Sequence, residues 1–109
     1  MAELRREMKD GSTFDPTKKV ELPDEALEKI QGGMWQYSDA VDYNPAWDNV
    51  LFSGVQVVWR ENGVLDHWAT VKSFTTVENK VTSFDLDLVY ENYYVYGVPA
   101  HEVMIQFPG

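Results

Sequence analysis

The chain has 109 residues, a formal net charge of −9, 44% hydrophobic residues and no cysteine. Its length allows one domain with an appended tail or leader, and its apolar content is too high for a disordered chain. The missing cysteine excludes disulfides and thiolate metal sites. No apolar run approaches the ~20 residues that cross a bilayer, so membrane insertion is not expected.

The negative charge is concentrated in the C-terminal two thirds of the chain. Residues 34–109 contain three Lys and Arg residues against ten Asp and Glu residues. Phosphate backbones and anionic lipid surfaces attract clusters of basic side chains. Nucleic acid is therefore not an expected partner, and neither is an anionic membrane.

The first third of the chain is predicted to hold one or two short helices. Residues 2–9 consist almost wholly of strong helix formers. A second helix is expected over residues 22–31, because Pro23 suits a first helical turn. Gly32 and Gly33 then end it, since glycine readily takes the conformations that close a helix.

The rest of the chain is predicted to form β-strands joined by tight turns. Asn62-Gly63 is a strong hairpin signal, and residues 81–90 alternate apolar and polar side chains as a half-buried strand does. The predicted fold is therefore α+β: short N-terminal helices followed by a four- to five-stranded antiparallel meander. Residues 1–33 form a leader-like helical segment in this prediction, and residues 34–109 form a small β-rich domain.

The segment LPDEALEKIQGG, residues 22–33, resembles the double-glycine leaders of bacteriocin-type and signalling precursor peptides. That pattern has apolar residues twelve, seven and four places before the cleavage point, and Leu22, Leu27 and Ile30 match it. Gly32 and Gly33 occupy the double-glycine positions. The resemblance is limited to these 12 residues, and the family often has other residues at the places of Pro23 and Ala26.

This resemblance implies a partner and a destination. A peptidase-containing ABC transporter would hold the three apolar side chains in a groove, cut after Gly33 and secrete an acidic, non-catalytic β-domain beginning at Met34. The hypothesis predicts that Gly33→Val prevents processing. The alternative is an intracellular α+β binding or interaction module in the cytoplasm, in which helix 22–31 is a structural element packed on the sheet.

Aromatic side chains supply the candidate binding face. Tyr90, Tyr93, Tyr94 and Tyr96 cluster near the C-terminus. Such rings stack on sugars or peptides when they are exposed, and they fill the core of a small domain when they are buried. Both interpretations remain open at the level of sequence. An exposed edge strand would also offer a route to a homo-oligomer.

Enzyme signatures are absent from the sequence. His67 and His101 are the two histidines and show no metal-binding spacing, so satisfied structural histidines are expected, and a small enzyme built around His67 is the weakest hypothesis. Asp85 and Asp87 share one strand face about 7 Å apart, where a solvated carboxylate pair is favoured over a cation site. The sequence therefore predicts no enzymatic activity, no metal and no cofactor.

Overall fold

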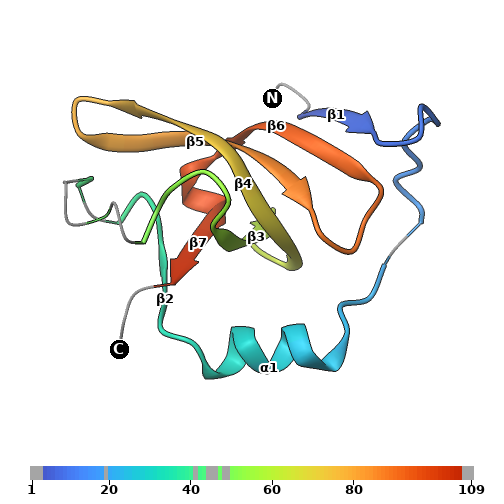
Figure 1. The fold of residues 1–109 in the computed structure, drawn as a ribbon, viewed down its shortest axis with the longest axis horizontal. Coiled ribbons are helices and arrows are strands. Elements are labelled where there is room, and N and C mark those ends of the chain that lie inside the picture. The colour runs from blue at the N-terminus through green and yellow to red at the C-terminus, as the bar shows by residue number, and fades with distance from the viewer. Residues whose placement is uncertain (1–3, 19, 41, 44–46, 48–49, 107–109) are drawn as a thin grey trace.

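The computed structural model describes residues 4–18, 20–40, 42–43, 47 and 50–106. Within these residues, seven strands form one antiparallel sheet in the order β1-β6-β5-β4-β3-β7-β2, and a single α-helix lies beside it (Figure 1). The elements in chain order are β1 (Arg5–Met8), α1 (Asp24–Gly32), β2 (Trp35–Tyr37), β3 (Gln56–Glu61), β4 (Leu65–Val77), β5 (Lys80–Leu88), β6 (Tyr93–Pro99), the 3-10 turn η2 (Ala100–Glu102) and β7 (Val103–Gln106).

Strands β3 to β6 follow one another as antiparallel neighbours, as the sequence predicts. Asn62 and Gly63 both have positive φ, of 53° and 78°, in the predicted hairpin turn between β3 and β4, where Glu61 pairs with Leu65. Glu78 and Asn79 form a two-residue turn between β4 and β5, where Val77 pairs with Lys80, and their φ values are 52° and 67°. These turns set the register of the central sheet.

The predicted fold class is wrong, because the described part of the chain is a sheet-dominated fold with one α-helix. Residues 2–9 were expected to be helical, yet Arg5–Met8 forms strand β1 and pairs with β6, with Arg6 opposite Val95. Leu4 and Met8 pack against the main core, while Arg5 and Glu7 are exposed. Helix propensity in so short a segment is weak, and pairing with a sheet edge outweighs it.

The C-terminal part of the sheet is also larger than a meander. After β6, the turn η2 carries the chain across the sheet, and β7 inserts between β3 and β2. Ser38, next to the end of β2, is fully buried and donates its hydroxyl to the carbonyl of Ala100 at 2.8 Å. This bond fastens β2 to the crossing segment. The boundary predicted at residue 33 therefore lies between elements that belong to one sheet.

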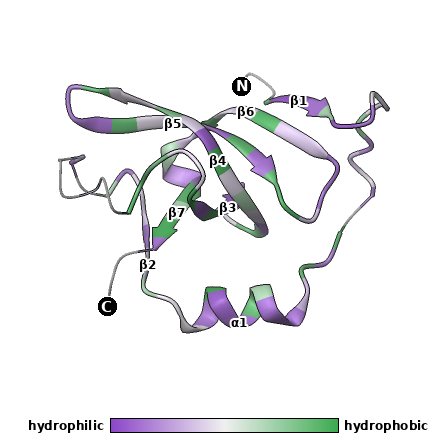
Figure 2. Cartoon of the chain, viewed as in Figure 1, coloured by the Kyte–Doolittle hydropathy of each residue, from purple (hydrophilic) through white to green (hydrophobic). Residues whose placement is uncertain are grey.

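The two faces of the sheet bury different sets of side chains. The main core combines residues from β3 to β7, including Trp59, Phe84, Leu86, Val95 and Ile105. A smaller helix-facing core lies on the opposite face, where Val58, Trp68 and Met104 are covered by partly buried side chains, namely Leu22, Ile30, Trp35, Tyr37 and Tyr90. Hydrophobic and hydrophilic residues alternate along the strands and on α1 (Figure 2).

Candidate functional site

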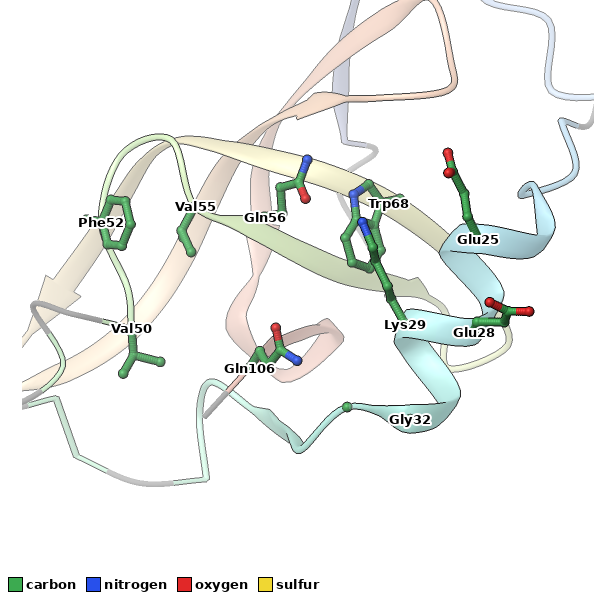
Figure 3. Close-up of a pocket in the computed structure, with 11 residues that line it drawn as sticks. Glu25, Glu28, Lys29, Gly32, Val50, Phe52, Val55, Gln56, Trp68 and Gln106 are labelled. Atoms are coloured by element: carbon green, nitrogen blue, oxygen red, sulfur yellow. The ribbon is translucent and has the colours of Figure 1, made fainter. Parts of the chain in front are cut away.

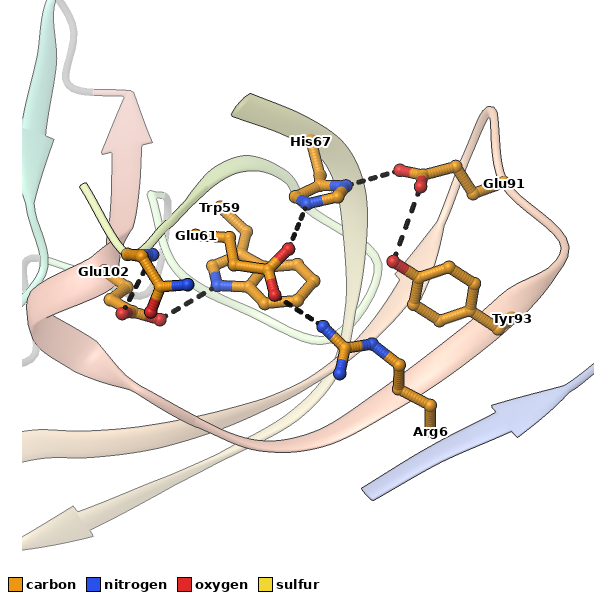
Figure 4. Close-up of polar contacts among 8 residues, drawn as sticks. Arg6, Trp59, Glu61, His67, Glu91, Tyr93 and Glu102 are labelled. Atoms are coloured by element: carbon orange, nitrogen blue, oxygen red, sulfur yellow. Dashed lines mark hydrogen bonds and ion pairs between the residues drawn. The ribbon is translucent and has the colours of Figure 1, made fainter. Parts of the chain in front are cut away.

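A pocket of about 460 Å³ lies at one end of the sheet, beside the β3–β4 turn. It is called the His67 pocket here. Its floor is charged, and its rim contains exposed aliphatic residues together with Lys18 and Asn62. The floor contains Arg6 from β1, Glu61 from β3, His67 from β4 and Glu91 from the β5–β6 turn (Figure 4). These four side chains are far apart in the sequence, and the sheet register brings them together.

His67 lies between two carboxylates. Its Nδ1 lies against a carboxylate oxygen of Glu91, and its Nε2 lies 2.9 Å from a carboxylate oxygen of Glu61 (Figure 4). The residue is only 3% exposed, and its ring stacks on Trp59 with 4.4 Å between ring centres. Because a carboxylate can only accept, each ring nitrogen must carry a proton to make its bond. The geometry therefore fits an imidazolium cation.

The electrostatics of the pocket favour the same protonation state. Burial opposes the charge and lowers the pKa of His67, but the hydrogen bonds and negative charges of Glu91 and Glu61 outweigh burial and raise the pKa above its usual value. Burial, followed by the charge of Glu91, raises the pKa of Tyr93 to about 12. Tyr93 is therefore neutral and donates its hydroxyl to Glu91 over 3.4 Å.

Arg6 supplies the second cation of the network. Its Nη2 pairs with Oε2 of Glu61 at 2.6 Å. Its guanidinium carbon lies 4.4 Å from the ring centre of Phe14 and 5.7 Å from those of Trp59 and Tyr93. Arg6 thus ties strand β1 to the floor of the pocket through both charge and ring contacts.

Glu102 completes the network behind Trp59. One carboxylate oxygen accepts from the Trp59 indole at 3.1 Å, and the other accepts from the backbone N–H of Asn62 at 3.1 Å. The β3–β4 turn is thereby anchored to η2. In chemical terms, two cations and two carboxylates neutralise one another on the floor, and both ring nitrogens of His67 are occupied.

A second hollow, of about 760 Å³, separates α1 from the sheet (Figure 3). Trp68 and Phe52 form part of its apolar wall, and Glu25, Glu28 and Lys29 of α1 form its polar edge. The hollow extends to Gly32 and Gly33 at the end of the helix. The double glycine is therefore part of the surface that faces the sheet.

The residues that resemble a leader have different environments in the folded chain. Leu22 and Ile30 are half-buried against the helix-facing core, whereas Leu27 is 40% exposed. Gly33 has an extended backbone and follows directly on α1. A Cβ atom at Gly33 would lie 2.8 Å from the carbonyl oxygen of Lys29, whereas one at Gly32 would meet nothing within 4 Å.

The four tyrosines of the predicted binding face do not share one surface. Tyr93 is buried in the main core, and Tyr90 lies beside α1, where its hydroxyl donates to Glu25 at 3.4 Å. Tyr94 and Tyr96 are half-buried on β6. Lys72 lies 4.1 Å from the ring centre of Tyr94 and 5.2 Å from that of Tyr96. Cations thus already contact the two more exposed rings.

The remaining candidates from the sequence lie outside the His67 pocket. His101 is exposed on η2. Asp85 accepts from Ser73 at 2.9 Å and from the backbone of Gly97 at 3.0 Å, and Asp87 pairs with Lys9 at 2.7 Å. Both carboxylates therefore have partners within the sheet.

The structure brings residues to the site that the sequence did not single out. Arg6, Glu61, Glu91 and Trp59 belong to different elements, and Arg6 and Glu61 are 55 positions apart. Of the residues on the pocket floor, the sequence pointed only to His67, which lies on a predicted strand that follows a hairpin turn. Its partners could only be identified once the register of three strands was known.

Comparisons with known proteins give no further assignment. No family model, curated protein or solved structure matches the chain. The described residues contain no helix that is long and apolar enough to span a membrane. They also contain no group of three or more histidine, cysteine or acidic side chains that could hold a metal ion.

Proposed function

We propose that this protein is a non-catalytic binding domain and that a protein partner docks at the mouth of the His67 pocket. The observation that carries the proposal is the contrast between floor and rim. The charged floor residues are paired with one another, while the rim exposes aliphatic side chains. Val64 is 84% exposed, and Val20 and Leu65 are each 41% exposed.

A protein partner suits this rim better than a small polar ligand does. Hairpin turns normally carry polar residues, and an exposed valine there contributes little to folding. Exposed apolar side chains around a hollow are typical of interaction sites, because a partner side chain can enter the hollow while the rim excludes water. The paired charges beneath would hold the rim in place.

Catalysis is a weaker interpretation of the same pocket. A general base needs an unprotonated nitrogen or oxygen within reach of a substrate. Both nitrogens of His67 donate to carboxylates, and the residue is buried. The expected role of His67 is therefore to hold Glu61 and Glu91 in position.

Site-specific photo-crosslinking in the native host tests the proposal. A photoreactive phenylalanine analogue is placed at residue 64 and, in a matched control, at residue 77. Val77 is also an exposed aliphatic residue beside a hairpin turn, at 55%, but it lies at the other end of β4. We expect one protein to be crosslinked from position 64 and not from position 77.

The substitution Val64→Lys provides a second test of the same docking site. Because Val64 is so exposed, the substitution should leave the fold unchanged, yet it should remove co-purification of the same partner. A partner that is retained by Val64→Lys, or that crosslinks equally from both positions, would exclude the His67 pocket as the docking site.

A second candidate function is the exported precursor with a double-glycine leader. One observation favours it: α1 ends at Gly32, the chain then runs extended through Gly33, and Met34 is 59% exposed. This is the local shape that a leader peptidase would need around its cleavage point. Cleavage there would also separate β1 and α1 from the remaining chain.

Gly32→Ala separates the two candidates more cleanly than Gly33→Val. A side chain at Gly33 collides with its surroundings, so loss of processing there would be confounded by misfolding. At Gly32 there is open space, and alanine is the better helix former. If the segment is a leader, Gly32→Ala stays folded but is not cut or secreted. Secretion and cleavage of this variant at the wild-type level would contradict a double-glycine leader, and a wild type that stays full-length in the cytosol would contradict export.

A further inference from the structure

Arg6 occupies a compact cage at the base of the His67 pocket. The cage is formed by the rings of Phe14, Trp59 and Tyr93 and by the carboxylate of Glu61. Phe14 and Tyr93 meet edge to face, with 5.2 Å between ring centres, which fixes two walls relative to each other. An aromatic box with one carboxylate is a typical site for an organic cation.

The shape of the cage favours a guanidinium group over an ammonium group. A planar guanidinium can stack on rings while its edge donates to a carboxylate, and it is more weakly hydrated than an ammonium ion. Arg6 does both, because its Nη2 reaches Glu61 while its guanidinium lies over the Phe14 ring. The Nε of Arg6 is buried and has no hydrogen-bond partner among the described residues. Arg6 therefore leaves part of its donor capacity unused.

Arg6 lies on an edge strand of the sheet. β1 has four residues and pairs only with β6, with Arg6 opposite Val95. The connection from residue 9 to residue 23 contains no helix or strand in its described part. An edge position with an extended backbone is one that a partner peptide can also take.

We propose that these four side chains form a guanidinium-binding site, which β1 fills with Arg6 and which an arginine side chain on a partner's extended segment can fill in its place. The ligand class is thus an arginine-bearing strand, with the backbone adding to β6 and the side chain entering the cage. This site lies below the rim proposed for docking and does not depend on it.

Chemical rescue of Arg6→Ala tests the site directly. The substitution removes the side chain beyond Cβ, and the space it leaves joins the His67 pocket, which Arg6 lines. Ethylguanidinium has the shape of the missing group, and ethylammonium at equal ionic strength is the control. Concentrations up to about 50 mM remain far below those at which guanidinium salts denature proteins.

The measured quantity is the melting temperature of the full chain. We expect Arg6→Ala to melt lower than wild type and ethylguanidinium to restore more than half of the loss, with ethylammonium restoring little. The matched variant is Arg5→Ala. Arg5 is the neighbouring residue of β1, is exposed and contacts the ring of Tyr96, so its variant should show no rescue.

Two outcomes would overturn the proposal. Equal effects of the two cations on Arg6→Ala would mean that the cage has no guanidinium preference, and equal rescue of Arg5→Ala would mean that the effect is unspecific. If Arg6→Ala does not fold alone, Arg6→Gln is titrated in the same way, and native tryptophan fluorescence is followed. The measurement requires no partner, so its failure is distinct from failure of the docking proposal.

Discussion

Replacing His67 with glutamine tests whether its imidazolium holds the pocket floor together. The substitution leaves Glu61 and Glu91 facing each other across the site without the cation between them, and Glu91 is largely buried. Breaking a buried ion pair by removing one partner destabilises proteins by about 3–5 kcal/mol. Because small domains are stable by only about 5–15 kcal/mol, we expect a large fall in the unfolding free energy near pH 6.

The loss should depend on pH in a defined direction. The carboxylates raise the folded-state pKa of His67 above 6.5, so the folded protein keeps the proton at pH values where the unfolded chain has released it. The stabilisation is thus complete below pH 6.5 and disappears as the pH rises through the folded-state pKa. Within that window one extra proton on the native state gives a slope of up to about 1.4 kcal/mol per pH unit.

Urea unfolding, followed by tryptophan fluorescence from about pH 5.5 to 9, measures both quantities. The difference between wild type and His67→Gln should be largest at low pH and shrink as the pH rises. His101→Gln serves as the control, because that histidine is exposed and outside the network. A difference that stays constant across the pH range would refute the proposed charge state of His67.

Four further substitutions test the packing, each by urea unfolding. Gly33→Ala should destabilise the fold by about 1–3 kcal/mol because its Cβ would meet the Trp35 indole. Gly32→Ala should instead stabilise the fold by about 0.4–1 kcal/mol. Equal effects of the two substitutions would contradict the described end of α1. Phe84→Ala should lower the unfolding free energy by about 3–5 kcal/mol because it leaves a cavity in the core. A loss below about 1 kcal/mol, which is typical of substitutions at exposed positions, would contradict the buried position of Phe84. Ser38→Ala should lower the unfolding free energy by about 0.5–1.5 kcal/mol by removing one buried hydrogen bond to the Ala100 carbonyl, which keeps its bond from the backbone N–H of Val103, and no loss would contradict the contribution of that bond.

The central sheet was predictable because its signals are local. The Asn62-Gly63 pair requires the backbone conformation that glycine and asparagine tolerate, and the alternation in residues 81–90 matches the pleat. β1 was not predictable, since its residues prefer helix and only the free edge of β6 makes a strand favourable. The place of β7 between β3 and β2 likewise depends on a crossing that no local pattern encodes.

The candidate site depends on contacts between distant residues. His67 could be noticed in the sequence, but nothing near it indicates that Glu61 and Glu91 face its two nitrogens. Gly33 illustrates a different difficulty. Gly33 matches the leader pattern, but the fold also requires glycine at this position. The Trp35 indole donates to the Lys29 carbonyl at 3.0 Å, and a Cβ atom at residue 33 would collide with both groups. A single sequence does not distinguish these two reasons.

The most direct test of the central claim is nitrogen NMR of the chain labelled with ¹⁵N-histidine. The protein has two histidines, so two ring systems appear, and His101→Gln assigns them. We expect His67 at neutral pH to carry a proton on both ring nitrogens, each in a hydrogen bond to a carboxylate. A neutral His67 ring with one unprotonated nitrogen would exclude the imidazolium between Glu61 and Glu91 and make His67 available as a catalytic base.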